Sequence, residues 1–236
     1  MAPLTDYFPL TRVVNLPARQ DRLREMTTQL AAMGMPFAAG EVELFSAISP
    51  EDAAGFTKPA VRGCYLSHLE ILRNARARGV NSVLILEDDL QVQPQDLETI
   101  SDMAEKLVES HWDIAYFGHL LPPGRAQASQ WSPLRGELRA SHFYAVHSGI
   151  FNKLIGYLED CQKRPEGHPV GGPMEYDGAL NMFRLWHPDT VTLVAQPSLG
   201  GQRSSQSDIH PSGERRISGI RQAASLARKV KKTLGG

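Results

Sequence analysis

Cysteines are few and long apolar runs are missing from this sequence, and each lack excludes a class of protein. Only two cysteines, Cys64 and Cys161, occur among the 236 residues. They match no metal-binding or redox spacing and cannot crosslink a fold of this size, so we expect two buried free thiols. No run of about 18 apolar residues is present, and the chain does not begin with a basic segment followed by an apolar one. We therefore expect no membrane span or secretion signal, and a cytoplasmic location.

The composition is that of one globular domain with an uneven distribution of charge. Hydrophobic residues make up 42% of the chain, which is enough for one sizeable core. The net charge of −1 hides an asymmetry, because residues 215–236 carry seven basic and no acidic residues, whereas residues 1–214 carry 18 basic and 26 acidic ones. An acidic body argues against a nucleic-acid surface, since phosphate binding needs clustered Lys and Arg.

The spacing of apolar residues predicts alternating strands and helices. Short β-branched or continuously apolar runs predict strands over residues 11–15, 42–48, 82–86, 112–117, 142–146 and 190–195. Apolar residues at helical spacing predict helices from Leu23 to Met33 and over 63–78, 94–110, 149–161 and 175–186. The polar stretches 121–136 and 165–173 predict surface loops. The expected fold is a three-layer α/β sandwich.

Three acidic residues follow the most apolar of the predicted strands. Glu87, Asp88 and Asp89 come directly after the run SVLIL, which is typical of a central strand covered on both faces. Ligands bind beyond the carboxyl ends of strands in open α/β sheets. Glu87 and Asp89 are two apart, so both can face one divalent ion, while Asp88 points elsewhere, to backbone or a ribose. The simpler alternative is that Asp88 and Asp89 start a loop and cap a turn.

Five segments, in the same order, resemble glycosyltransferase family 25, the lipopolysaccharide-type and collagen galactosyltransferases. They are VVNLPARQDR (13–22), GCYLSH (63–68), VLILEDDL (83–90), YDGALNMFR (176–184) and VAQPSLGGQRSSQSDI (194–209). The resemblance implies a GT-A fold with a central mixed, mostly parallel sheet, in a single domain over residues 1–212. It also implies inverting transfer of a hexose, by family habit galactose, from a UDP-sugar to a saccharide acceptor in cell-surface glycan or lipopolysaccharide synthesis.

The resemblance also assigns a metal ion and a donor site. Mn²⁺ or Mg²⁺ would neutralise the leaving diphosphate, with Glu87, Asp89 and, as a further ligand, His210 around the ion. Ser67 and His68 are expected near the start of the 63–78 helix, where they can contact the donor phosphates, although a lone histidine is more often buried and structural. The remaining donor-binding candidates are Asn15, Pro17, Arg19, Arg22, Asp88, Gln202, Arg203 and Ser205. Arg19 and Arg22 can instead form a solvated helix face.

Inverting transfer needs a carboxylate that removes the proton of the acceptor hydroxyl. Asp177 and Glu175, at the start of the 175–186 helix, are the candidates, and the resemblance favours Asp177. Capping of the helix N-terminus would by itself explain an acid at either position. Whether Asp177 acts as the base or holds the sugar stays open at this point.

Two other classes of protein compete with this interpretation. A metal-dependent nucleotidyl or phosphoryl transferase would also place acids after a strand, but no GxxxxGKS/T or GxGxxG motif is present. A nucleotide-sugar-binding protein without turnover would keep the fold and the donor site. Metal-dependent hydrolysis of nucleotide sugars separates these alternatives.

The basic tail over residues 213–236 has its own pattern. Apolar residues recur at helical spacing between the arginines and lysines, which predicts a basic amphipathic helix. One alternative is that this helix packs on the acidic body. The other is reversible, salt-sensitive contact with an anionic membrane, at about 1 kcal/mol per basic residue near the surface.

Overall fold

A computed structural model of the protein describes residues 2–121 and 128–203. Its centre is a seven-stranded sheet in the order β2-β1-β3-β7-β5-β8-β6. The strands are β1 (Thr11–Asn15), β2 (Val42–Ser46), β3 (Ser82–Glu87), β5 (Ile114–Gly118), β6 (Gln130–Pro133), β7 (Phe143–His147) and β8 (Thr192–Gln196). A second sheet pairs β4 (Leu90–Gln91) with β9 (Gly201–Gln202).

Most strands of the large sheet run in one direction. β1 is parallel to β2 and β3, and β5 is parallel to β8. β7 is antiparallel to both of its neighbours, β3 and β5, and β6 is antiparallel to β8. Five of the seven strands therefore share a direction, which confirms the mixed, mostly parallel sheet expected from the sequence.

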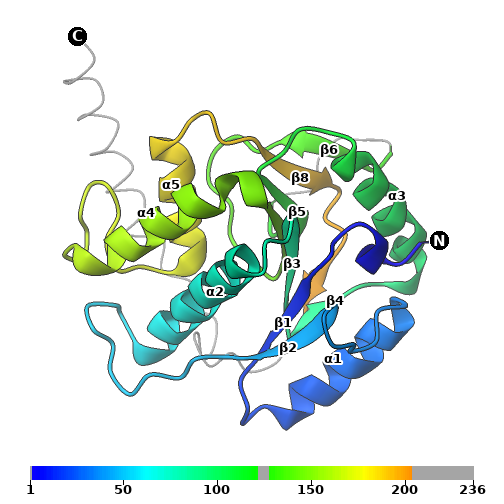
Figure 1. Ribbon diagram of the computed structural model, residues 1–236, viewed down its shortest axis with the longest axis horizontal. Coiled ribbons are helices and arrows are strands. Elements are labelled where there is room, and N and C mark those ends of the chain that lie inside the picture. Colours follow the sequence, from blue (N-terminus) through cyan, green and yellow to red (C-terminus); the bar gives the residue numbers. More distant parts are fainter. Residues whose placement is uncertain (1, 122–127, 204–236) are drawn as a thin grey trace.

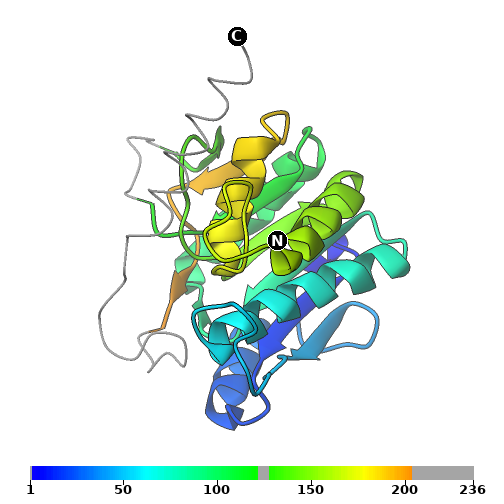
Figure 2. The ribbon, with the colours of Figure 1, turned by 90° about the vertical axis from the view of Figure 1, so that its left-hand side faces the viewer.

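Helices cover both faces of this sheet (Figure 1). They are α1 (Gln20–Ala32), α2 (Pro59–Ala77), α3 (Leu97–Val108), α4 (Phe151–Lys163) and α5 (Tyr176–Trp186), with 3₁₀ turns at Leu4–Asp6, Pro94–Asp96 and Ser148–Ile150. α2, α4 and α5 pack on one another over one face, and Figure 2 shows α2 and α4 side by side. α1 and α3 cover the other face, so the fold is the three-layer α/β sandwich that the alternation predicts.

β3 shows why the sheet has two cores. Val83 and Ile85 pack in the cluster with α2, α4 and α5, whereas Leu84 and Leu86 pack in the cluster with α1 and α3. Successive side chains of a strand point to opposite faces, so a continuous apolar run is needed where both faces are covered. The run SVLIL meets this need, and it places the acids that follow at the edge of both cores.

The structure differs from the sequence expectations at three places. The stretch 121–136 contains the edge strand β6, which pairs with β8 through a partly exposed, polar segment that apolar periodicity does not reveal. α2 begins at Pro59, four residues before the predicted start, because proline suits the first turn of a helix. β4 and β9 have only two residues each and were not predicted.

Two further expectations concern the tail and membrane spans. The tail over 213–236 and its proposed amphipathic helix lie outside the described residues. Within residues 2–121 and 128–203, no helix combines the length and the apolar character that crossing a membrane requires.

Candidate active site

The carboxyl ends of β1 and β3 meet at one edge of the large sheet. Their parallel register aligns Val14 with Glu87, so Asn15 and the acids after β3 are neighbours. The antiparallel strand β7 begins at the same edge, where the backbone N–H of Glu87 donates to the carbonyl of His142 at 2.9 Å. This edge is where open α/β sheets bind their ligands.

Asp88 is paired on the side of β1 and α1. Its Oδ2 accepts a hydrogen bond from Asn15 Nδ2 at 2.7 Å, and its Oδ1 accepts from Arg22 Nη1 at 3.0 Å. The side chains of Asp88 and Arg22 are only 8% and 11% exposed. Burial raises the pKa of Asp88, although the Asn15 hydrogen bond and the Arg22 charge act in the opposite direction. Asp88 therefore ties β1, β3 and α1 together, and Asn15 and Arg22 are its partners.

Glu87 and Asp89 face one amide group. Gln202 Nε2 lies 3.4 Å from Glu87 Oε2 and 3.5 Å from Asp89 Oδ1, so the two carboxylates turn to the same point as their spacing predicts. Burial and the charge of Glu87 raise the pKa of Asp89 to about 7. Burial also acts to raise the pKa of Glu87, but His68, His142 and Arg22 outweigh it and hold that pKa below its ordinary value.

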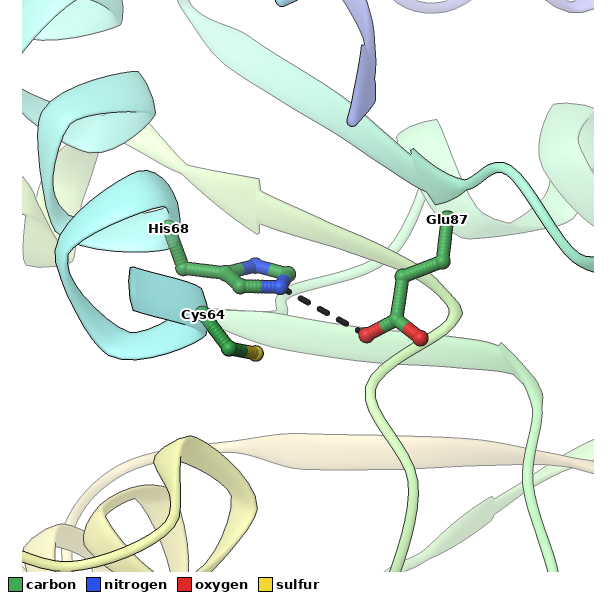
Figure 3. A group of neighbouring side chains, drawn as sticks. All are labelled: Cys64, His68 and Glu87. Atoms are coloured by element: carbon green, nitrogen blue, oxygen red, sulfur yellow. Dashed lines mark ion pairs between the residues drawn. The ribbon is translucent and has the colours of Figure 1, made fainter. Parts of the chain in front are cut away.

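Cys64 and His68 lie one turn apart on α2 and face Glu87 (Figure 3). His68 Nε2 is 3.5 Å from Glu87 Oε1, and Sγ of Cys64 lies within 4.8 Å of ligand atoms of both residues. His68 Nδ1 is 2.8 Å from the hydroxyl of Tyr144, and its ring stacks on Tyr176 with centroids 4.3 Å apart. In the part of the chain that the structure describes, no other three His, Cys, Asp or Glu side chains come this close.

This arrangement corrects two expectations. Cys161 is buried as predicted, but Cys64 is only half-buried, and its spacing to His68, C-x-x-x-H on a helix, is compatible with a metal site. Burial raises the pKa of the Cys64 thiol well above its ordinary value. The negative charges that add to this effect come from Glu87, Asp177, Asp89 and Glu175.

Ser67 has a structural role and does not lie at a helix start. Because α2 begins at Pro59, Ser67 and His68 are in the middle of the helix, and both are fully buried. Ser67 Oγ donates to the carbonyl of Gly63 at 2.7 Å and accepts from the N–H of Ile48 at 2.8 Å. A Cβ at Gly63 would lie 2.3 Å from the Ile48 oxygen. The motif GCYLSH therefore holds α2 against residue 48, and the expectation that Ser67 and His68 lie near a helix start is wrong.

Asp177 lies in the first turn of α5. Its Oδ1 accepts from the N–H of Gly178 at 2.7 Å and its Oδ2 from the N–H of Ala140 at 3.1 Å. Burial raises the pKa of Asp177 and the charge of Glu87 adds to this, in spite of the two N–H donors. Glu175 is the N-cap residue of α5, and its side chain makes no capping hydrogen bond. The fold thus brings Asp177 within electrostatic reach of Glu87, from which it is distant in sequence.

The remaining candidates take different places. Arg203 joins the acids, with its backbone N–H donating to the carbonyl of Asp89 at 2.8 Å and its Nη1 to that of Asp88 at 3.2 Å. Arg19 pairs with Asp21 at 3.0 Å, and Pro17 is exposed in the turn before α1. Ser205 and His210 lie outside the described residues.

Comparisons with known proteins give little beyond this geometry. No protein-family model and no curated protein sequence matches the chain. Among solved structures, it is similar to a glycosyltransferase involved in the glycosylation of the major capsid of PBCV-1, with 11% identity and a TM-score of 0.48 over 94% of this chain and 100% of that one. It is also similar to a protein from STIV, with 10% identity and a TM-score of 0.40 over 88% and 98% of the two chains. With such low values, neither neighbour says what this chain does.

Proposed function

We propose that this protein is a divalent-metal-dependent glycosyltransferase. In this proposal a hexose, galactose by the family resemblance, moves with inversion from a UDP-sugar to a saccharide acceptor in cell-surface glycan or lipopolysaccharide synthesis. The observation that carries the proposal is the pair Glu87 and Asp89, whose carboxylates face one point beyond β3 with the Gln202 amide between them. The sequence resemblance supplies the reaction, and this geometry is compatible with it.

The acidic pair fits a hard divalent ion. Two half-buried carboxylates that face one point repel each other, and this repulsion adds to the desolvation in raising the pKa of Asp89 to about 7. A cation between them removes that repulsion, and carboxylate and amide oxygens are ligands that Mn²⁺ and Mg²⁺ prefer. Glu87 and Asp89 would hold the ion, and Gln202 would join them by turning its amide so that the oxygen replaces Nε2 at this point. The ion would neutralise negative charge on a departing diphosphate.

Asp177 is the proposed base. Its carboxylate is fixed by the N–H groups of Gly178 and Ala140, so it keeps one orientation. Its raised pKa suits a group that accepts the proton of the acceptor hydroxyl, because proton transfer is most effective when the pKa of the base approaches the working pH. Asp88 and Arg22 hold α1 against β3, and thereby position the carboxylates on either side of Asp88.

A donor-hydrolysis assay tests the proposal. Purified protein is incubated with a panel of nucleotide sugars and Mn²⁺, Mg²⁺ or excess chelator, and the released nucleotide is identified. We expect UDP from a UDP-hexose in the presence of a metal ion and none with chelator. Asp89→Asn should keep the fold and lower turnover at least about 100-fold. The matched control is Asp102→Asn, at an exposed acid on α3, which should retain full turnover.

Each other outcome contradicts the proposal in a recognisable way. Full turnover in excess chelator would exclude the metal role of Glu87 and Asp89. Release of UMP in place of UDP would indicate nucleotidyl or phosphoryl transfer. Binding of a nucleotide sugar without turnover under any condition would favour the binding-protein alternative.

A further inference from the structure

A second set of potential metal ligands lies between α2 and the carboxyl end of β3. Cys64 and His68 are four residues apart on α2, so both point from one helix face towards Glu87 at the end of β3 (Figure 3). Their Sγ and Nε2 atoms and a carboxylate oxygen of Glu87 all lie within 4.8 Å of one another. A thiol, an imidazole and a carboxylate form a donor set unlike the all-oxygen pair of Glu87 and Asp89.

The hydrogen bonds around His68 determine which ring nitrogen faces this cluster. The Tyr144 hydroxyl donates to the Tyr176 hydroxyl at 3.0 Å, so at 2.8 Å it accepts the hydrogen of His68 Nδ1. In the neutral ring, Nε2 then carries the lone pair. Nε2 is buried and makes no hydrogen bond to any residue that the structure describes, although Glu87 Oε1 faces it at 3.5 Å, and the whole side chain is only 1% exposed. A hydrogen bond from the second nitrogen to a fixed partner is typical of a metal-ligating histidine.

The separation of His68 and Glu87 suits an ion between them. The His68 Nε2 atom and the Glu87 Oε1 atom face each other at 3.5 Å, so either a proton or a metal ion between them is favourable. Two ligands of a tetrahedral ion with bonds of about 2.1 Å are about 3.4 Å apart, close to the observed separation. The thiol of Cys64 lies beside both atoms and offers a metal ion the third ligand that a proton would not use.

We propose that Cys64, His68 and Glu87 form a binding site for a zinc-type transition-metal ion. Thiolate and imidazole ligands favour Zn²⁺ or Co²⁺ over Mg²⁺, which prefers oxygen ligands. On binding, the Cys64 thiol releases its proton to solvent and its sulfur bonds the ion, so one thiolate and one carboxylate balance the two positive charges. Three protein ligands leave the fourth tetrahedral position to water or a substrate oxygen, the arrangement of catalytic zinc sites.

Contacts with the 48–50 segment hold α2 in a fixed position, as a metal site requires. Gly63 allows the helix to approach the Ile48 carbonyl, and Ser67 Oγ accepts from the Ile48 N–H at 2.8 Å. Cys64 and His68 therefore come from a helix fixed on the side of the 48–50 segment, while Tyr144 and Tyr176 fix the imidazole ring. Rigid elements and a fixed second shell are what a metal site needs. The site stands on these contacts and does not require the proposed function, although both use Glu87.

Cobalt spectroscopy on the full-length, tag-free protein tests this site. Co²⁺ added to the chelator-treated protein should give a thiolate-to-cobalt charge-transfer band that saturates at a single equivalent and disappears when Zn²⁺ is added. Cys64→Ser should abolish the band, and His68→Gln should weaken Zn²⁺ binding at least about tenfold in competition with a chromophoric chelator. Cys161→Ser is the matched control and should keep both the band and the affinity. Circular dichroism verifies that each variant is folded.

A second measurement needs no variant. Zn²⁺ should protect Cys64 from alkylation by iodoacetamide in the wild-type protein, as read by mass spectrometry of the two cysteine-containing peptides, and Mg²⁺ should not. Absence of the cobalt band in the wild type, equal Zn²⁺ affinity in Cys64→Ser, or equal alkylation with and without Zn²⁺ would overturn the site. Donor turnover with Mn²⁺ but no cobalt band would leave the proposed function standing without this site. A cobalt band without donor turnover would support the metal site and contradict the proposed function.

Discussion

The carboxyl end of β3 separates two regions that balance charge in different ways. On the paired side, next to β1 and α1, Asp88 meets the Arg22 guanidinium at 3.0 Å and the Asn15 amide at 2.7 Å. On the crowded side, next to α2, α5 and β9, burial and the charge of Glu87 raise the pKa of both Asp89 and Asp177. Neighbouring acids in one sequence run thus have different roles. Asp88 holds elements together, while the acids beside it form a site that a cation or a proton stabilises.

The largest expected effect concerns the crowded side. Asp177→Asn should lower kcat for sugar transfer at least about 100-fold, because an amide cannot take the acceptor proton. The donor KM should hardly change, as expected for a group that acts in the transition state. Steady-state kinetics with Mn²⁺ checks this, with Asp189→Asn, at an exposed acid beyond α5, as the control. Unchanged kcat, or loss of donor binding alone, would place Asp177 outside the chemistry.

A substitution on the paired side should lower the stability of the protein. Asp88→Ala removes the 3.0 Å partner of Arg22 in a place where both side chains are nearly buried, and Arg22 keeps its 3.8 Å ion pair with Asp89. The free energy of unfolding should fall by about 1–3 kcal/mol, measured by urea denaturation. Asp21→Ala removes the exposed partner of Arg19 and should leave stability unchanged. Equal stability of the two variants would show that the paired side is not a structural anchor.

A similar or smaller effect on stability is expected where α2 packs against residue 48, and it tests the crowded side of the comparison. Gly63→Ala puts a Cβ 2.3 Å from the Ile48 carbonyl oxygen, so the free energy of unfolding should fall by about 1–3 kcal/mol. Gly156→Ala, in the interior of α4, brings its Cβ within 4 Å of no atom outside its own helix in residues 2–121 and 128–203, and it should raise stability by about 0.5–1 kcal/mol. The two variants make the same substitution in two helices. Opposite signs are expected, and a gain at Gly63 would contradict the close seating of the helix that carries Cys64 and His68.

The smallest effect is a pH dependence of the metal-free protein. The pKa of Asp89 is about 7 in the fold and has an ordinary value of 3.8. Folding therefore favours its protonated form, and this contribution to stability is complete below about pH 4 and is lost as the pH rises through about 7. The lowered pKa of Glu87 acts in the opposite sense.

Urea denaturation in chelator at several pH values measures this effect. The stability of the wild type relative to Asp89→Asn should decline between about pH 4 and pH 7. A saturating divalent ion should remove the decline, because the bound cation favours the ionised carboxylates. A difference that stays constant, or that grows with pH, would contradict crowding at Asp89.

The sequence predicted the elements of the fold better than the contacts of the site. The runs at 11–15 and 82–86 become β1 and β3 because β-branched and continuously apolar segments have few other stable conformations in a two-sided core. The sequence pattern did not predict β6, because its polar residues lie on an exposed edge of the sheet. At the site, Gln202 and Arg203 join the acids after β3, whereas Ser67 has a purely structural partner in Ile48.

By itself the sequence determined the alternation of strands and helices, the two-sided core of β3 and the position of three acids at its carboxyl end, because these follow from the local spacing of residues along the chain. The tertiary structure decided how those acids are divided. Arg22 reaches Asp88 across 66 positions of the chain, and His68 reaches Glu87 from a neighbouring helix. Such contacts depend on how α1 and α2 pack against β1 and β3. Local periodicity says which face of a helix is apolar, but it does not say which polar side chains that packing brings together.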